Sequence, residues 1–156
     1  MKKINLLISI LTFSCPLMAT NLKVSLVEYV HSDDPEFIRG INVTVSWNNS
    51  WNNARNYDAA WLFFKFVSKQ GGSKHAHIIS EATKQIWKSS NKIPDAEFKV
   101  ADDGTGLMVS SSSAYRGELS YRLFISLDTA RLNETYINNL STVELEGYGI
   151  EMVYIP

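Results

Sequence analysis

Short segments in which apolar and polar residues alternate recur along this chain, and they limit the possible folds more than any other feature. The longest runs from Leu119 to Leu127, and another, from Ile41 to Trp47, alternates cleanly. A period of two puts every second side chain on the same face, which is typical of a strand with one buried face. Helical periodicity is scarce by comparison. The sequence therefore predicts an all-β fold.

Other segments complete the expected set of strands. The run from Ala59 to Val67 is apolar on both faces apart from Lys65, which predicts a central strand. Gly71-Gly72 and Asp102-Asp103-Gly104 predict turns. The remaining strands are expected at residues 22–30, 75–79, 97–100, 106–110, 143–146 and 150–154, with one or two helical turns at 81–89 and a loop at 133–139. About eight short strands favour an antiparallel two-sheet β-sandwich of immunoglobulin-like or jelly-roll-like type.

The first nineteen residues predict a secretory signal peptide. Lys2 and Lys3 precede an apolar run at residues 4–13, which is too short to span a bilayer. Ala19 supplies the small residue expected before the cleavage site. The alternative is lipoprotein processing at Cys15, which follows a loose lipobox. We therefore expect export to the periplasm or the extracellular space, with a lipid anchor on Cys15 as the alternative.

Removal of this peptide changes the charge and the cysteine content. The mature chain has 137 residues (156 minus 19), the size of one domain, and its net charge moves from −1 to −3 because two lysines are lost. Mild acidity without a basic stripe argues against nucleic acid or an anionic membrane as a partner. Cys15 is the single cysteine. The mature chain can therefore form no disulfide and offers no thiolate nucleophile.

The strand patterns also predict a core. Trp47 is expected to be buried because it lies in the apolar phase of its strand. The same argument predicts burial between the sheets for six further residues: Val43, Val45, Trp61, Phe63, Leu123 and Ile125.

Two aromatic residues are the candidate ligand contacts. Trp51 and Tyr57 lie in an asparagine-rich segment between two predicted strands, and asparagine favours turns. Aromatic rings there can stack on the C–H face of a sugar. Packing that plugs the loop is the alternative interpretation of both residues.

Two polar clusters could carry other chemistry. His75 and His77 would share a strand face, but two imidazoles are too few ligands for a structural zinc site. Asp102 and Asp103 lack the repeated oxygen ligands of a calcium loop, and a D-D-G sequence is typical of a turn. We therefore expect no metal, no cofactor and no catalytic residue.

Several phrases together resemble one protein family. They are VSWNNSWNNARNYDAAW at residues 45–61, KFVSKQGGSKHA at 65–76, ADDGTGLMV at 101–109 and GIEMVYIP at 149–156. They resemble the N-terminal accessory β-domain of secreted, formylglycine-generating-enzyme-like (sulfatase-modifying-factor) bacterial proteins. After the signal peptide at 1–19, the resemblance implies an accessory domain at 20–147 and, at 148–156, the first strand of a catalytic-type domain that is cut off.

The same resemblance implies the function. In the enzymes the second domain binds copper through a cysteine pair, and no residue of the mature chain corresponds to that pair. We therefore expect a secreted, non-catalytic module with an interaction or scaffolding role and an unknown protein or glycan partner. The alternative is a carbohydrate-binding or cell-surface adhesion module that uses its loop aromatics. A hydrolase is least favoured, because no nucleophile and base can be paired.

Overall fold

The computed structural model describes residues 21–31, 33, 38–53, 55–69, 71–131 and 143–154. These described residues form nine β-strands and one short 3-10 helix, η1. The elements are β1 (Lys23–His31), β2 (Ile38–Asn52), β3 (Tyr57–Ser68), β4 (Ser73–His75), β5 (Ile78–Lys88), β6 (Ala96–Val100), β7 (Leu107–Ser111), β8 (Tyr115–Leu127), η1 (Thr129–Arg131) and β9 (Val143–Tyr154). The prediction of an all-β fold is confirmed.

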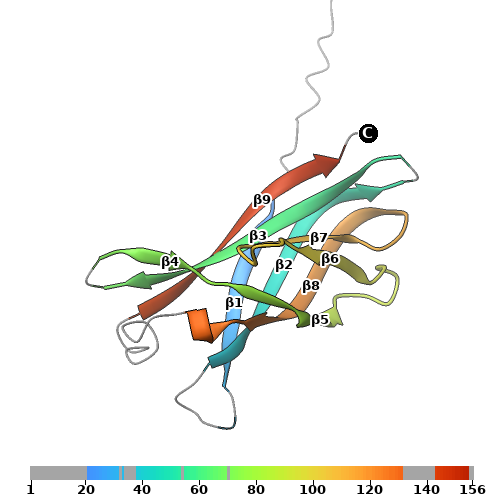
Figure 1. The fold of residues 1–156 in the computed structure, drawn as a ribbon. Helices are drawn as coiled ribbons and strands as arrows, with labels where there is room; N and C mark the ends of the chain where they lie inside the picture. The colour runs from blue at the N-terminus through green and yellow to red at the C-terminus, as the bar shows by residue number, and fades with distance from the viewer. Residues whose placement is uncertain are drawn as a thin grey trace, which may run out of the picture.

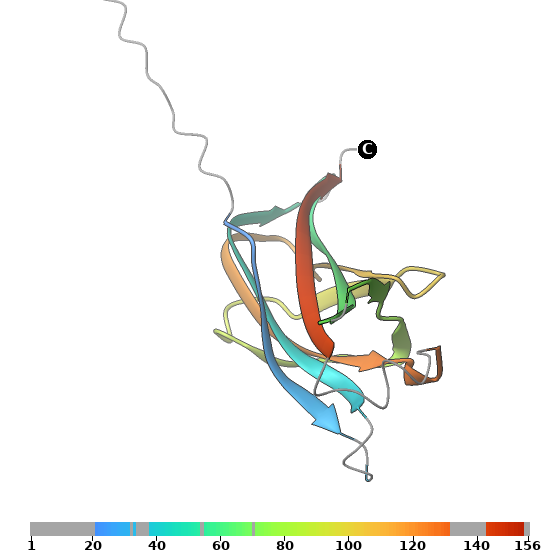
Figure 2. The same cartoon turned by 90° about the vertical axis from the view of Figure 1, so that its left-hand side faces the viewer.

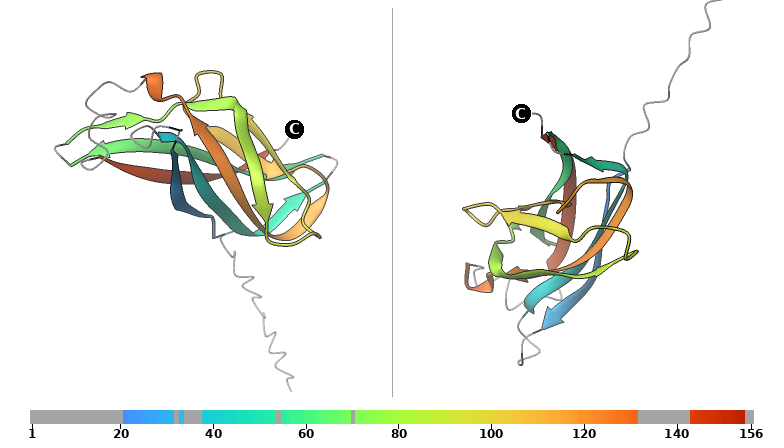
Figure 3. Two further views of the ribbon diagram at one scale, coloured as in Figure 1. Left: turned by 90° about the horizontal axis from the view of Figure 1, so that it is seen from below. Right: turned by 90° about the vertical axis from the view of Figure 1, so that its right-hand side faces the viewer.

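The strands build two layers (Figure 1). The first has the order β1-β2-β8-β5, and the second has the order β9-β3-β7-β6, with β4 paired to the end of β3. Every described pairing is antiparallel. At the open sides β1 lies beside β9, and β5 lies beside β6. The layers therefore curve toward each other, and the molecule is nearly barrel-shaped (Figures 2 and 3).

A corner between β2 and β3 connects the two layers. There Asn52 pairs with Tyr57, so all nine strands belong to one continuous hydrogen-bonded sheet. The corner forms because β2 is long and contains an irregularity between Trp47 and Ser50, and a β-bulge increases the local twist of a strand.

The core fills the space between the layers. Val43, Val45, Leu123 and Ile125 are completely buried, as predicted. Trp47 is also buried, and its ring meets the ring of Tyr121 edge to face at 6.2 Å. Opposite them lie buried residues of the second layer: Leu62, Phe64, Phe66, Leu107 and Val109.

The predicted burial of Trp61 and Phe63 is wrong. Both side chains are only half-buried, on the outer face of β3. The core positions of β3 are the even-numbered residues, among them Leu62 and Phe64. Because β3 is apolar on both faces, its alternation does not distinguish the inner face from the outer one.

The predicted helical turns at 81–89 are also wrong, because residues 78–88 form β5. This strand pairs with β8 through two irregularities, so its burial does not alternate regularly. Ile86 and Trp87 are exposed, and the guanidinium of Arg122 lies 5.9 Å from the Trp87 ring centre. Backbone hydrogen bonds to β8, rather than an apolar face, hold this segment extended.

The segment at 75–79 is divided between two strands. β4 pairs with β3 after a turn at Gly71 and Gly72, both of which have positive φ, as the hairpin prediction required. The pairing ends at His75, however, and Ile78 already pairs with β8. The predicted hairpin around Asp102-Asp103-Gly104 is confirmed, since β6 pairs with β7 on either side of it.

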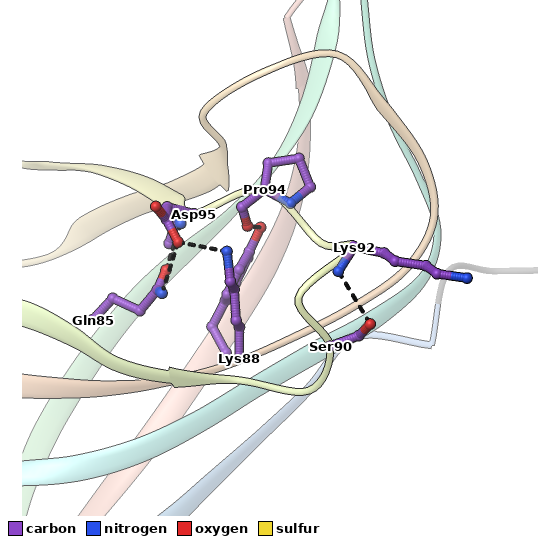
Figure 4. A network of polar contacts seen from close by, with 8 residues as sticks. Gln85, Lys88, Ser90, Lys92, Pro94 and Asp95 are labelled. Atoms are coloured by element: carbon purple, nitrogen blue, oxygen red, sulfur yellow. Dashed lines mark hydrogen bonds and ion pairs between the residues drawn. The ribbon is translucent and has the colours of Figure 1, made fainter.

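A polar network closes the connection from β5 to β6 (Figure 4). Lys88 forms an ion pair with Asp95 at 2.7 Å, and Gln85 Nε2 donates to the same carboxylate oxygen. These hydrogen bonds, from Lys88 first and Gln85 second, hold the pKa of Asp95 below its usual value. Tyr121 Oη donates to the Pro94 carbonyl, so the connection is also tied to β8.

The last described strand, β9, pairs with β3 from Val143 to Tyr154. The predicted extended conformation of residues 148–154 is confirmed. The expected domain boundary between residues 147 and 148 lies within this strand. The expected signal peptide and the loop at 133–139 lie outside the described residues.

Candidate ligand-binding site

The candidate site is built on the bulge near the end of β2. Asn49 lies there with φ 56°, a left-handed conformation that asparagine tolerates better than most residues. The bulge shifts the strand phase, so that Ser50 is fully buried while Trp51 stays half-exposed. Asn49 therefore has a local structural reason, because the strand changes phase at this bulge.

Asp58 fixes the corner from inside. Its side chain is buried and accepts hydrogen bonds from Trp47 Nε1 at 2.9 Å, from Ser50 Oγ at 2.8 Å and from the Trp51 backbone N–H at 3.1 Å. A buried carboxylate is tolerated when donors of this kind replace water. Asp58 therefore sets the position of the Trp51 backbone.

Two asparagine amides are fixed by the backbone. Asn53 Oδ1 accepts hydrogen bonds from the N–H groups of Arg55 and Asn56 and stabilises the turn. Asn52 Nδ2 donates to the Ser111 carbonyl at 2.7 Å. Each amide is held through one of its two polar atoms, so the other polar atom can bond to a ligand.

The opposite wall comes from the start of β8. The register pairs Trp51 with Arg116 and Ser50 with Gly117. Tyr115 Oη donates to the Glu118 carbonyl at 3.0 Å. Together these two walls enclose a depression of about 750 Å³, lined by Asn49, Trp51, Asn52, Asn53, Tyr115, Arg116 and Gly117.

Of the two predicted aromatic contacts, only Trp51 lines this depression. Tyr57 lies on the outer face of β3, where its ring stacks on that of Tyr154 with centres 5.1 Å apart. Tyr57 borders a smaller depression of about 190 Å³, together with Phe98 and Met108. Asn52 lines both depressions, but the structure does not bring the two aromatic rings into one site.

Sequence reasoning did not identify Tyr115 and Arg116 as site residues. They lie more than sixty residues beyond Trp51 in the chain, and only the register of β2 against β8 brings them beside it. The short chemical motifs that can be read from sequence contain no signal for such a pairing. The glycine at position 117 is a sequence signal for this wall, because glycine within a strand suggests an irregularity. In the structure Gly117 has φ 148°.

A third depression, of about 480 Å³, lies where three connections meet. His77 Nδ1 is 3.0 Å from the Asp103 carbonyl, and the Ile78 N–H donates to the Gly104 carbonyl. Hydrogen bonds from the Thr105 N–H and hydroxyl lower the pKa of Asp103. The contacts at this depression join the β4–β5 connection to the β6–β7 turn.

The predicted histidine pair is divided by the fold. The His75 ring lies 5.8 Å from the Phe63 ring, whereas His77 faces the Asp103 turn. Within the part of the chain that the structure describes, no three histidine, cysteine or acidic side chains are grouped to hold a metal ion.

Comparison with protein-family models, curated proteins and solved structures finds no match to this chain. The resemblance to formylglycine-generating-enzyme-like proteins therefore depends on the sequence phrases alone. None of the helical residues that the structure describes forms a segment with the length and apolar character to cross a bilayer.

Proposed function

We propose that this chain is an exported, non-catalytic binding module and that the depression at the β2–β3 corner takes a neutral oligosaccharide. The observation that carries the proposal is the composition of its walls, where Trp51 and Tyr115 lie among three asparagines. Aromatic rings can stack on the apolar face of a sugar ring, and amides both donate to and accept from its hydroxyl groups. Arg116 is the one charged side chain among the described lining residues, and it adds further donors.

The anchored amides support this proposal energetically. Asn52 and Asn53 are already ordered by their hydrogen bonds to the backbone. The backbone of Trp51 is itself held in place, because its N–H donates to Asp58. Binding would then cost little additional side-chain entropy, which otherwise opposes association by about 0.5–1.5 kcal/mol per immobilised side chain.

The test is a titration with neutral oligosaccharides of glucose and of N-acetylglucosamine, followed by tryptophan fluorescence and calorimetry. Trp51→Ala should weaken binding at least about tenfold, or about 1.4 kcal/mol. Trp87→Ala is the matched control, because Trp87 is an exposed tryptophan on β5 that does not line the depression. Binding that is lost equally in both variants, or in neither, contradicts the proposed site.

An interaction or scaffolding role, which the family resemblance implies, is the second candidate. The observation that favours it is the outer face of β9, where Tyr148, Ile150, Met152 and Tyr154 are exposed. Contiguous apolar side chains on a protein surface often mark an interaction site.

A further inference from the structure

The two layers of the molecule differ in charge. The strands of the first layer, β1, β2, β8 and β5, carry six lysine and arginine residues against three acidic residues, a net charge of +3. The strands of the second layer, including β4, carry three lysines against five acidic residues, a net charge of −2. The cations of the first layer are spread over four strands, so the sequence contains no basic run. Strand pairing alone gathers them.

Strand register brings part of this charge to the outer face of the first layer. Residues directly opposite each other in neighbouring strands share a face of the sheet. Leu123 and Ile125 are fully buried, so the alternate positions of β8 point outward. Two rows therefore cross the outer face: Ser25, Thr44, Arg122 and Trp87 in one, and Glu28, Asn42, Phe124 and Lys84 in the other. These two rows, together with Arg39, are here called the basic face.

Aromatic rings hold two guanidinium groups on this face. Arg39 Cζ lies 5.3 Å from the Phe124 ring centre, and Arg122 Cζ lies 5.9 Å from the Trp87 ring centre. Such cation–π contacts restrict where the guanidinium group can lie. The Phe124 ring also lies against Gly40, where it would meet a Cβ atom, and it is only 5% exposed. Trp87 remains 49% exposed and can contact a ligand.

The cations of the basic face are available to a ligand. Arg39, Lys84 and Arg122 are exposed, and within the part of the chain that the structure describes none of them forms an ion pair. The single carboxylate of the two rows, on Glu28, accepts a hydrogen bond from Asn42 Nδ2 at 2.6 Å. A guanidinium group can hold a carboxylate through two parallel charge-assisted hydrogen bonds. The basic face therefore favours an anionic ligand.

The polar residues beside these cations favour a sugar polymer over a nucleic acid. Ser25, Thr44 and Asn42 lie in the same two rows, and hydroxyl and amide groups both donate to and accept from sugar hydroxyl groups. Single-stranded nucleic acids instead stack successive bases on a series of aromatic rings. In the two rows Trp87 is the one exposed ring, because Phe124 is buried.

We propose that the basic face binds an acidic polysaccharide. The carboxylates of its uronic acid residues bind Arg39, Lys84 and Arg122, and a sugar ring packs against Trp87. This site is separate from the depression proposed above for a neutral oligosaccharide. Arg116, which lines that depression, lies six residues along β8 from Arg122, a distance of about 20 Å in a strand. The two sites can therefore be tested independently.

The first test compares two ligands that differ in charge alone. Calorimetry at low ionic strength measures the affinity of the full chain for oligogalacturonate and for the same oligosaccharide after its carboxyl groups have been reduced to alcohols. Oligogalacturonate should bind at least about tenfold more tightly, because charge-assisted hydrogen bonds are stronger than neutral ones. Added salt should weaken this binding by screening the charges. Equal affinities for the two ligands, or no binding of oligogalacturonate, overturn the proposal.

The second test locates the binding on the basic face. Arg122→Ala should weaken the binding of oligogalacturonate at least about tenfold, because it removes a bidentate contact to a carboxylate. Lys84→Ala should weaken it by a smaller factor. Lys99→Ala is the matched control for Lys84→Ala, because it makes the same change of charge at an exposed lysine of β6, in the second layer. Thermal unfolding checks that each variant keeps its fold. Equal effects of Lys84→Ala and Lys99→Ala overturn the assignment to this face.

The third test separates this site from the neutral one and from a nucleic-acid site. Trp87→Ala should weaken the binding of oligogalacturonate and leave neutral oligosaccharides unaffected, whereas Trp51→Ala should do the reverse. Loss of both ligands in the same variant contradicts two separate sites. If neutral oligosaccharides bind and oligogalacturonate does not, only the present proposal fails. A single-stranded oligothymidylate that binds more tightly than oligogalacturonate, and is lost in Arg122→Ala, would assign the basic face to nucleic acid and overturn the proposal.

Discussion

Asp58 is the residue on which the candidate site most depends. It follows Tyr57 and precedes two alanines, so by position it is a carboxylate in the buried phase of a strand. The structure explains its presence, because Oδ1 accepts two hydrogen bonds and Oδ2 accepts the third, from Trp47. An acidic residue at a buried strand position suggests such a hydrogen-bond network, but the sequence does not identify the donors.

The first prediction replaces this carboxylate. Asp58→Asn can keep the two bonds at one oxygen, but its amide N–H₂ then faces the Trp47 N–H, donor against donor. The free energy of unfolding should fall by about 1–3 kcal/mol, the cost of an unsatisfied buried group. Urea unfolding measures this loss, with the exposed Glu118→Gln as the control. An unchanged midpoint would show that the network does not hold the corner.

Tyr121 leads to a prediction about pH. Burial raises the pKa of its hydroxyl to about 12, whereas the unfolded chain releases that proton near pH 10. The folded state therefore favours the protonated phenol. Its contribution to stability is complete below about pH 10 and is lost as the pH rises to about 12.

The measurement is the urea midpoint as a function of pH from neutral to alkaline conditions. Tyr121→Phe removes the titrating group together with its hydrogen bond to the Pro94 carbonyl. The variant should start less stable and lose less stability than the wild type between about pH 10 and 12. Parallel curves for the two proteins would contradict this assignment.

At the scale of the elements, β5 depends on one threonine. Between Ile79 and Lys84 the pairing with β8 is irregular, and Thr83 bridges the gap. Its hydroxyl group donates to the Ile79 carbonyl at 2.8 Å and accepts from the Ser126 N–H at 3.2 Å. The side chain thus replaces ladder bonds that the bulge interrupts.

Thr83→Val keeps the shape of this side chain and removes the hydroxyl group. The loss leaves the buried Ser126 N–H without this acceptor, so stability should fall by about 1–3 kcal/mol. Thr83→Ser keeps the hydroxyl group and should lose clearly less. Chemical denaturation compares the two, and hydrogen exchange at Ser126 reports the local effect. A loss in Thr83→Val no larger than the loss in Thr83→Ser would contradict a dominant role for the hydroxyl bridge.

At the scale of the whole molecule, the export prediction can be tested on the full chain. After expression in a bacterial host, mass spectrometry should find a mature protein that begins at Thr20, because Ala19 is the small residue before the cut. Cys15→Ser should leave this processing unchanged. If Cys15→Ser abolishes processing, or if the wild type carries a lipid on Cys15, the alternative anchor is correct.

The sequence by itself determined most of the strands and part of the core, because period-two alternation is local and follows directly from strand geometry. Residues 41–47 and 119–127 could be assigned in this way, and the buried side chains of Val43 and Leu123 followed. The apolar residues 59–67 could be assigned as a strand but not oriented. Either Trp61 and Phe63 or Leu62 and Phe64 could face the core, because both pairs fit an alternating strand pattern.

Tertiary structure decided everything that depends on which strands are neighbours. β9 lies along β3, so Tyr148 and Tyr154 meet the rings of Phe63 and Tyr57 on the outer face, and the other phase of β3 fills the core. The register of β8 against β2 brings Arg116 beside Trp51. Pairing with β8 also keeps β5 extended at residues 81–88, where the local sequence pattern predicted helical turns. These choices are made by contacts between residues far apart in the chain, and a local periodicity carries no information about them.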